Sequence, residues 1–287
     1  MPSTSANGIT IEYEAIGDPG GAPLLLIHGL GAQLVSWDDD LIRILADRGF
    51  RVIRFDNRDA GLSSWFDESG VPDALGVLSG SEKPTYLVAD MADDAAALLR
   101  ALGIGPAHVL GVSMGGMIAQ SLAIRHPSLV ATLTSVMSTT GDSSVGSPNE
   151  AAMQALLAEP PTDREGAIES ALAAWRITGS PGYPLHEDRI RDATGLAYDR
   201  AFHPDGVARQ LMAVLASPDR TPGLEKLEMR TLVIHGDSDP LIDPSGGKAT
   251  ARAVPGAELW MLPGVGHDLP VELFGVFVDR LAGHCGL

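Results

Sequence analysis

Short apolar runs alternate with helical patterns along most of this chain. Continuous apolar runs, which are typical of parallel strands covered on both faces, occupy 22–29, 50–56, 106–113, 129–138, 230–237 and 257–264. The run at 8–17 instead alternates between apolar and polar residues, and this alternation predicts an antiparallel edge strand. Apolar residues recur every three or four positions in 86–103 and again from Met114 to Arg125, which predicts helices. The sequence therefore predicts a doubly wound, mostly parallel α/β sheet.

One region interrupts this rhythm, because 139–226 contains no convincing strand. Helical patterns fill it instead, at 149–158, 163–176, 186–200 and 205–217, and Thr162 with Glu165 resembles a capping box. We therefore divide the chain into a first part of the core (1–138), an all-helical insertion (139–226) and a second part of the core (227–287). The insertion is expected to lie over a site at the ends of the parallel strands. The alternative is a surface elaboration that gates nothing.

Charge narrows the classes of partner. The 287 residues include 37 acidic and 20 basic side chains, which gives a net charge of −17. Binding to nucleic acid or to anionic membranes requires clustered Lys and Arg, so we expect neither. The apolar runs are also far shorter than the roughly 20 residues of a membrane-spanning helix.

Cysteine content and the N-terminus bear on compartment and cofactors. Cys285 is the single cysteine, and 1–10 shows neither a basic segment nor an apolar one, so we expect a cytoplasmic protein without disulfides. No Cys/His cluster has metal-site spacing. The glycine-rich "HGLGAQL" has Leu34 where a dinucleotide fingerprint needs its third glycine. We therefore expect no metal and no cofactor.

The stretch "GVSMG" places Ser113 between a predicted strand and a predicted helix. A G-x-S-x-G turn of this kind holds its serine in a strained conformation above the sheet edge, and Gly111 and Gly115 leave room for the two backbones. Ser113 is therefore the candidate nucleophile, and the amide of Met114 lies at the positive end of the new helix. The alternative is a glycine-rich turn that merely contains a serine.

A serine nucleophile needs a base, and the chain has eight histidines. His267, in "LPGVGHDLP", follows the last predicted strand on a glycine-rich loop that should emerge at the same sheet edge as Ser113. It is the candidate base. The others lie within or at the end of strands, before a proline, in the insertion or in the tail: His28, His108, His126, His186, His203, His235 and His284.

The orienting acid should follow another strand, between the serine and the histidine in chain order. "VIHGDSDPLIDP" offers Asp237, Asp239 and Asp243. Asp239 lies further out on the loop and should reach the neighbouring histidine better, so we favour it. Asp237 stays open as the alternative, with a turn or cap as its ordinary role.

Two converging backbone donors would complete an oxyanion site, and Met114 supplies one of them. The second is expected from "HGLGAQ" at 28–33, where Gly29 and Gly31 allow the backbone to turn the Leu30 amide toward Ser113.

Together, "LLLIHGLG", "RFDNRDAGLSS", "GVSMGG", "LVIHGDSDPLI" and "LPGVGHDLP" resemble the α/β-hydrolase superfamily over nearly the whole chain outside the insertion. "WRITGSPGYP" and 244–270 are further similar to an esterase/lipase-like subgroup that includes aclacinomycin methylesterase. The resemblance implies the same nucleophile, base, acid and oxyanion donors, and it makes the insertion a helical cap. In "DNRDAGLS" this sequence departs from the pattern, because Asp59 stands where many relatives have glycine.

These features favour a serine carboxylesterase that cleaves small-molecule or short- to medium-chain esters through an acyl-enzyme. C–C bond hydrolases, lactonases and perhydrolases keep the same three side chains, so they remain alternatives that pocket shape must separate. A binding protein that acts as a small-ligand receptor is a further alternative from another class.

Overall fold

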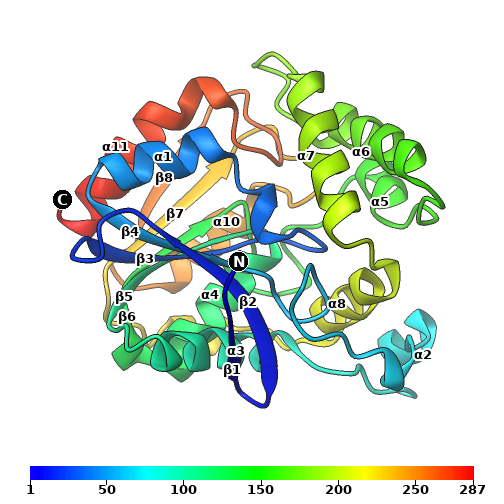
Figure 1. Ribbon diagram of the computed structural model, residues 1–287, viewed down its shortest axis with the longest axis horizontal. Helices are drawn as coiled ribbons and strands as arrows, with labels where there is room; N and C mark the ends of the chain where they lie inside the picture. Colours follow the sequence, from blue (N-terminus) through cyan, green and yellow to red (C-terminus); the bar gives the residue numbers. More distant parts are fainter.

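A single eight-stranded sheet runs through the molecule, and its strands lie in the order β1-β2-β4-β3-β5-β6-β7-β8 (Figure 1). The computed structural model describes residues 1–287. The strands are β1 (Ser3–Ala6), β2 (Ile9–Ile16), β3 (Ala22–Ile27), β4 (Phe50–Phe55), β5 (Ala107–Val112), β6 (Val130–Val136), β7 (Thr231–Gly236) and β8 (Glu258–Leu262). From β4 across to β8 all neighbours pair in parallel. The predicted mostly parallel α/β sheet is confirmed.

The edge of the sheet differs from the prediction. β2 pairs antiparallel with β4, as expected, but β1 pairs with its other side and is the true edge strand. Asn7 and Gly8 connect β1 to β2 with φ values of 50° and 76°. Two consecutive residues with positive φ make the tight hairpin turn for which Asn-Gly is the preferred pair. The prediction that β2 is an edge strand is therefore wrong.

Helices cover both faces of the sheet. On one face lie α1 (Asp39–Asp47) and α11 (Phe274–Cys285), and on the other lie α3 (Val88–Ala101) and α4 (Met114–Arg125) (Figure 1). Nearly every residue of α4 is buried, including Gln120 and Ser121. A helix that is covered on all sides belongs to the interior, so the serine at its start is held by the core.

Five helices follow β6 and precede β7: α5 (Glu150–Leu156), α6 (Arg164–Thr178), α7 (Glu187–Arg200), α8 (Pro204–Ala216) and α9 (Thr221–Leu224). Figure 1 shows α5, α6 and α7 grouped at one side of the sheet. The start of α6 corrects a local prediction: its N-cap is Asp163, whose side chain accepts the Gly166 amide, rather than Thr162. A carboxylate accepts this N3 hydrogen bond well and also complements the helix dipole.

The remaining elements are short or lie beside β8. They are η1 (Leu34–Ser36), η2 (Asp67–Ser69), α2 (Ala74–Ser79), η3 (Pro127–Leu129), α10 (Ser245–Ala253) and η4 (Val271–Leu273). None of the helices combines the length and the apolar character needed to cross a membrane.

Candidate active site

Ser113 stands at the turn between β5 and α4 with φ 57° and ψ −122°. A residue other than glycine is strained at positive φ. Here the packing of the surrounding backbone holds Ser113 in this conformation. A Cβ on Gly111 would collide with the carbonyl of Gly115, and a Cβ on Gly115 would collide with the carbonyl of Ile27. Glycine is thus required on both sides of the serine, because the backbone at the start of α4 is in contact with the backbone of β5 and with the end of β3.

His267 lies beside Ser113, as the sequence predicts. Its Nε2 is 2.9 Å from the Ser113 Oγ, and its Nδ1 is 2.8 Å from an Asp239 carboxylate oxygen. With the ring proton on Nδ1, the imidazole donates to the carboxylate, and Nε2 is left to accept the serine proton. The structure thus brings Ser113, His267 and Asp239 into one hydrogen-bonded line, although 154 residues separate the serine from the histidine.

Asp239 is buried, and both of its carboxylate oxygens contact hydrogen-bond donors. Its Oδ1 accepts the amides of Leu241 and Ile242, both at 2.9 Å, and its Oδ2 faces His267 and, at 3.4 Å, His235. Burial alone would raise the pKa of this carboxyl, but the hydrogen bonds from His235 and His267 outweigh it and hold the pKa below its ordinary value. Asp239 is therefore a carboxylate at neutral pH.

Asp237 has a different position. Its side chain is exposed, and its Oδ1 accepts the Gly264 amide at 2.8 Å and the Ser238 hydroxyl at 2.9 Å. These contacts join two loops across the turn, and none of them reaches His267.

The two predicted oxyanion donors flank Ser113. A Cβ on Gly29 would lie 3.3 Å from the Ser113 Cβ, so the turn that carries Leu30 packs directly on the serine. Met114 is the first residue of α4, where backbone N–H groups have no partner within the helix. Neither the Leu30 amide nor the Met114 amide donates a hydrogen bond within the chain.

His28 stabilises the turn that carries Leu30. Its ring packs against Trp37 with a centroid separation of 4.5 Å, and its Nδ1 accepts the Gly29 amide at 2.8 Å. Burial lowers the pKa of the His28 imidazole to about 4, so the ring is neutral at pH 7. A neutral ring is required for Nδ1 to accept this hydrogen bond.

A second histidine, His235, lies beside Asp239, and the sequence pattern does not predict this. His235 lies in a predicted strand and is buried, and it also contacts Asp239 and donates from Nε2 to the Ile242 carbonyl at 2.8 Å. A Cβ on Gly247 of α10 would collide with its ring. The glycine pair at the start of α10 was therefore the available signal that a large side chain packs there.

The end of α6 and the segment after it contact the loop that carries His267. The His267 amide donates to the Thr178 carbonyl at 2.7 Å, and the Gly182 amide donates to the Gly264 carbonyl at 2.9 Å. The Ser180 hydroxyl accepts the Gly266 amide at 2.9 Å and donates to Asp268. The backbone next to His267 is therefore held by residues that precede α7.

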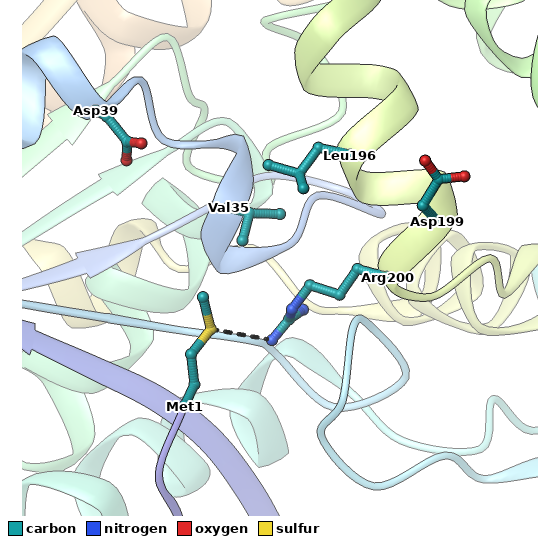
Figure 2. Close-up of a pocket in the computed structure, with 6 residues that line it drawn as sticks. All are labelled: Met1, Val35, Asp39, Leu196, Asp199 and Arg200. Carbon is teal, nitrogen blue, oxygen red and sulfur yellow. Dashed lines mark hydrogen bonds between the residues drawn. The ribbon is translucent and has the colours of Figure 1, made fainter.

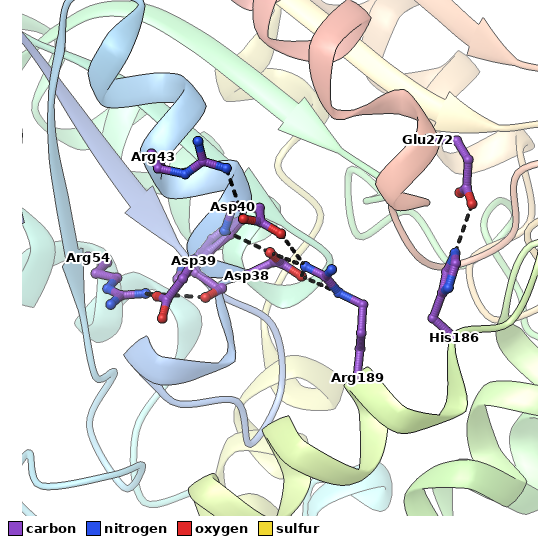
Figure 3. Close-up of polar contacts among 9 residues, drawn as sticks. Asp38, Asp39, Asp40, Arg43, Arg54, His186, Arg189 and Glu272 are labelled. Carbon is purple, nitrogen blue, oxygen red and sulfur yellow. Dashed lines mark hydrogen bonds and ion pairs between the residues drawn. The ribbon is translucent and has the colours of Figure 1, made fainter.

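The helices α7 and α8 are tied to the core by ion pairs. Figure 3 shows Arg189 of α7 paired with Asp38 and with Asp40, and His186, the residue before α7, with its Nε2 2.8 Å from a Glu272 carboxylate oxygen. These pairs are exposed, and exposed pairs contribute little each.

The ion pair on α8 is different, because Arg209 is buried. It donates to both oxygens of Asp59, at 2.9 Å and 2.8 Å, and to Asp67 at 2.8 Å. Asp59 has φ 64° and also accepts the Tyr86 hydroxyl. Asp59, which stands where many relatives have glycine, thus holds α8 against the loop after β4. Asp59, Asp67 and His203 are close enough to hold a metal ion, but the Arg209 guanidinium already lies among them.

A surface cavity of about 400 Å³ lies where α7 meets η1, and Figure 2 shows its lining of Met1, Val35, Asp39, Leu196, Asp199 and Arg200. Ser113, His267 and Asp239 do not line it. This cavity is therefore separate from the candidate active site.

Comparison with known proteins identifies the family of the chain. The family described as the alpha/beta hydrolase fold matches residues 22–272. Rhodomycin D methylesterase DauP of Streptomyces sp. (strain C5) is 30% identical, over 96% of this chain and 95% of that protein.

Two solved structures share the fold. The enol-lactonase from Burkholderia xenovorans LB400 has a TM-score of 0.75 and 23% identity and covers 100% of both chains. The meta-cleavage product hydrolase CumD from Pseudomonas fluorescens IP01 also has a TM-score of 0.75, with 21% identity over 100% of this chain and 97% of that chain. Because the family match spans most of the chain and the methylesterase relative spans nearly all of it, the chain belongs to the α/β-hydrolase family and is an ester hydrolase.

Proposed function

We propose that this protein hydrolyses carboxylic esters of small molecules with Ser113 as nucleophile, His267 as general base and Asp239 as orienting acid. The observation that supports the proposal is the line of hydrogen bonds from the Ser113 Oγ through His267 to the buried Asp239. This arrangement of nucleophile, base and orienting carboxylate is the one that serine hydrolases use on unrelated folds.

In the first half of the reaction, the Ser113 oxygen attacks the ester carbonyl carbon while its proton moves to the His267 Nε2. Asp239 stabilises the resulting imidazolium and holds the ring in place. His267 then gives the proton to the departing alkoxide, so the alcohol leaves and the acyl group stays on Ser113. In the second half, water loses a proton to His267 and attacks the acyl-enzyme, which releases the acid and restores the serine.

The negative charge on the carbonyl oxygen needs donors that are already oriented. We assign this role to the amides of Leu30 and Met114, which flank Ser113 and have no acceptor within the chain. Loss of one such donor typically costs about 3 kcal/mol of transition-state stabilisation.

We further propose that 139–226 is a cap that covers this site. Contacts on two sides of Ser113 support it: the Thr178 carbonyl holds the His267 amide, and Gln210 on α8 holds the turn that carries Leu30. The name of the relative DauP, a rhodomycin D methylesterase, puts methyl esters first among the substrates to test.

The test is a chain-length series of p-nitrophenyl esters together with methyl esters, lactones and C–C cleavage substrates, assayed on the wild type and on Ser113→Ala. We expect the wild type to turn over the esters and the folded variant to lose this activity. Ester hydrolysis that survives in the variant would contradict the mechanism. Faster turnover of a lactone or of a C–C substrate than of any open ester would change the substrate class and keep the residues.

A further inference from the structure

The turn that carries the Leu30 amide has a conformation that needs external support. The Ala32 amide donates to the Gly29 carbonyl at 3.3 Å, and Gly31, the third residue, has φ 67°. These are the marks of a type II turn, in which the peptide between the second and third residues is flipped relative to a type I turn. The Gly31 N–H belongs to this central peptide. Whichever group accepts it therefore fixes the turn.

Gln210 on α8 is that acceptor. Its Oε1 accepts the Gly31 amide at 2.8 Å, and its Nε2 donates to the Arg58 carbonyl at 2.7 Å. The side chain is completely buried. Because one end of the carboxamide must accept and the other must donate, its orientation is fixed by the two backbone groups.

The position of α8 is itself well defined. Arg209, the neighbour of Gln210, is locked onto Asp59 by two hydrogen bonds. One turn earlier, Val207 packs on the turn so closely that a Cβ on Gly31 would lie 2.9 Å from its Cγ2. Gln210 therefore presents its oxygen from a rigid helix.

A second tie joins the same loop to α7. The Gln33 Nε2 donates to the carbonyls of Ala197 and Ala201, both at 2.7 Å, and its Oε1 accepts from Arg200 at 2.8 Å. The loop on the Leu30 side of Ser113 is thus attached to two helices of the insertion.

We propose that Gln210 is a positioning residue that sets the oxyanion site by holding the Gly29–Ala32 turn in its type II form. The inference rests on the proposed function, because it concerns the Leu30 donor of that reaction. Without the Gln210 oxygen, the Gly31 N–H is left without its acceptor, and the central peptide relaxes by rotating about bonds on both sides of it. The Leu30 amide, one peptide away, then loses its alignment. A displacement of about 1 Å at a reacting group can lower the rate about 100-fold.

The decisive variant is Gln210→Met, which keeps the approximate size of the side chain and removes the acceptor. We expect kcat for a p-nitrophenyl ester to fall about 10- to 100-fold, with KM little changed. The affinity for a trifluoromethyl ketone, which forms an oxyanion on the serine, should fall by the same factor as kcat/KM. The affinity for the matching methyl ketone, which binds without forming it, should stay the same.

Three further variants make the outcome specific. Gln154→Met makes the same change at an exposed glutamine of α5 and should behave as wild type. Gln210→Glu should recover most of kcat, because a buried carboxyl keeps its proton and then offers both an acceptor to Gly31 and a donor to Arg58. It also provides the test if the methionine variant does not fold. Ser113→Ala reports on the chemistry itself.

An unchanged kcat in Gln210→Met, or equal losses of affinity for both ketones, would overturn the positioning role. So would a glutamate variant as slow as the methionine variant. Residual turnover in Ser113→Ala would instead overturn the proposed function, so the two failures are distinguishable.

Discussion

The substitution Asp239→Asn examines the orientation of His267 with very little change in shape. In the native site, Oδ1 faces the amide donors of Leu241 and Ile242, and Oδ2 faces the His267 Nδ1. An asparagine has one acceptor and one donor group. Its oxygen takes the side with the two amide donors at 2.9 Å, because the opposite orientation would set its NH₂ group against both of them. On the other side, the His235 Nε2 is further away, at 3.4 Å, and keeps its hydrogen bond to the Ile242 carbonyl.

The asparagine NH₂ group is then directed at the His267 Nδ1. It can only donate, so Nδ1 must accept, and the ring proton moves to Nε2. This wrong tautomer points an N–H at the Ser113 hydroxyl and cannot take its proton. The equivalent change in serine hydrolases lowers kcat about 10⁴-fold, which corresponds to roughly 5.5 kcal/mol at about 1.4 kcal/mol per factor of ten.

The assay is kcat for p-nitrophenyl butyrate, with Asp237→Asn as the matched control on the same loop. The control should retain nearly full activity, because an asparagine oxygen can still accept from Gly264 and Ser238. A larger loss in Asp237→Asn than in Asp239→Asn would refute the assignment. So would equal activity of Asp239→Asn and the wild type.

The same carboxylate links stability to pH. The pKa of Asp239 is lower in the folded chain than in the unfolded chain, where the ordinary value is about 3.9. Its contribution to stability is therefore complete above that value and is lost as the pH falls through the folded pKa. The free energy of unfolding of the wild type should decrease more steeply below about pH 4 than that of Asp239→Asn. Parallel pH profiles from denaturant titrations would contradict this.

Two further changes address the framework of the site. Arg209→Met should lower the free energy of unfolding by about 3–5 kcal/mol in urea titrations, because the buried Asp59 carboxylate loses its arginine partner. Arg164→Met, at an exposed pair, should change it by less than about 1 kcal/mol. Equal effects of the two substitutions would contradict the argument that burial makes the Arg209 pair the stronger one. Gly111→Ala should lower the free energy of unfolding by more than about 4 kcal/mol or prevent folding, since the new Cβ would collide with the Gly115 carbonyl. A variant with wild-type thermal stability would contradict this, because it would show that the turn between β5 and α4 relaxes freely.

The sheet and the candidate residues could be predicted because their signals are local. Apolar runs mark the strands, and Ser113, Asp239 and His267 each follow one of them within a few residues. The carboxyl ends of parallel strands share one edge, so order along the chain was enough to expect these side chains to meet.

The supports of the site could not be predicted in the same way, because their partners are far apart in sequence. Arg209 pairs with Asp59 across 150 residues, and Gln210 reaches Gly31 across 179. Nothing in the local pattern distinguishes these side chains from ordinary polar residues on a helix. The hairpin at the edge of the sheet could have been predicted, because Asn7-Gly8 is a recognisable local turn signal that directly precedes the alternating strand.

The central claim is that Ser113, activated by His267, is the nucleophile, and covalent labelling tests it most directly. The protein is treated with a fluorophosphonate, and the adduct is located by mass spectrometry of its peptides. We predict one adduct per chain, on Ser113, with hydrolysis lost in proportion to labelling, and no adduct in Ser113→Ala. An adduct on another residue, or full labelling with ester hydrolysis intact, would contradict the account.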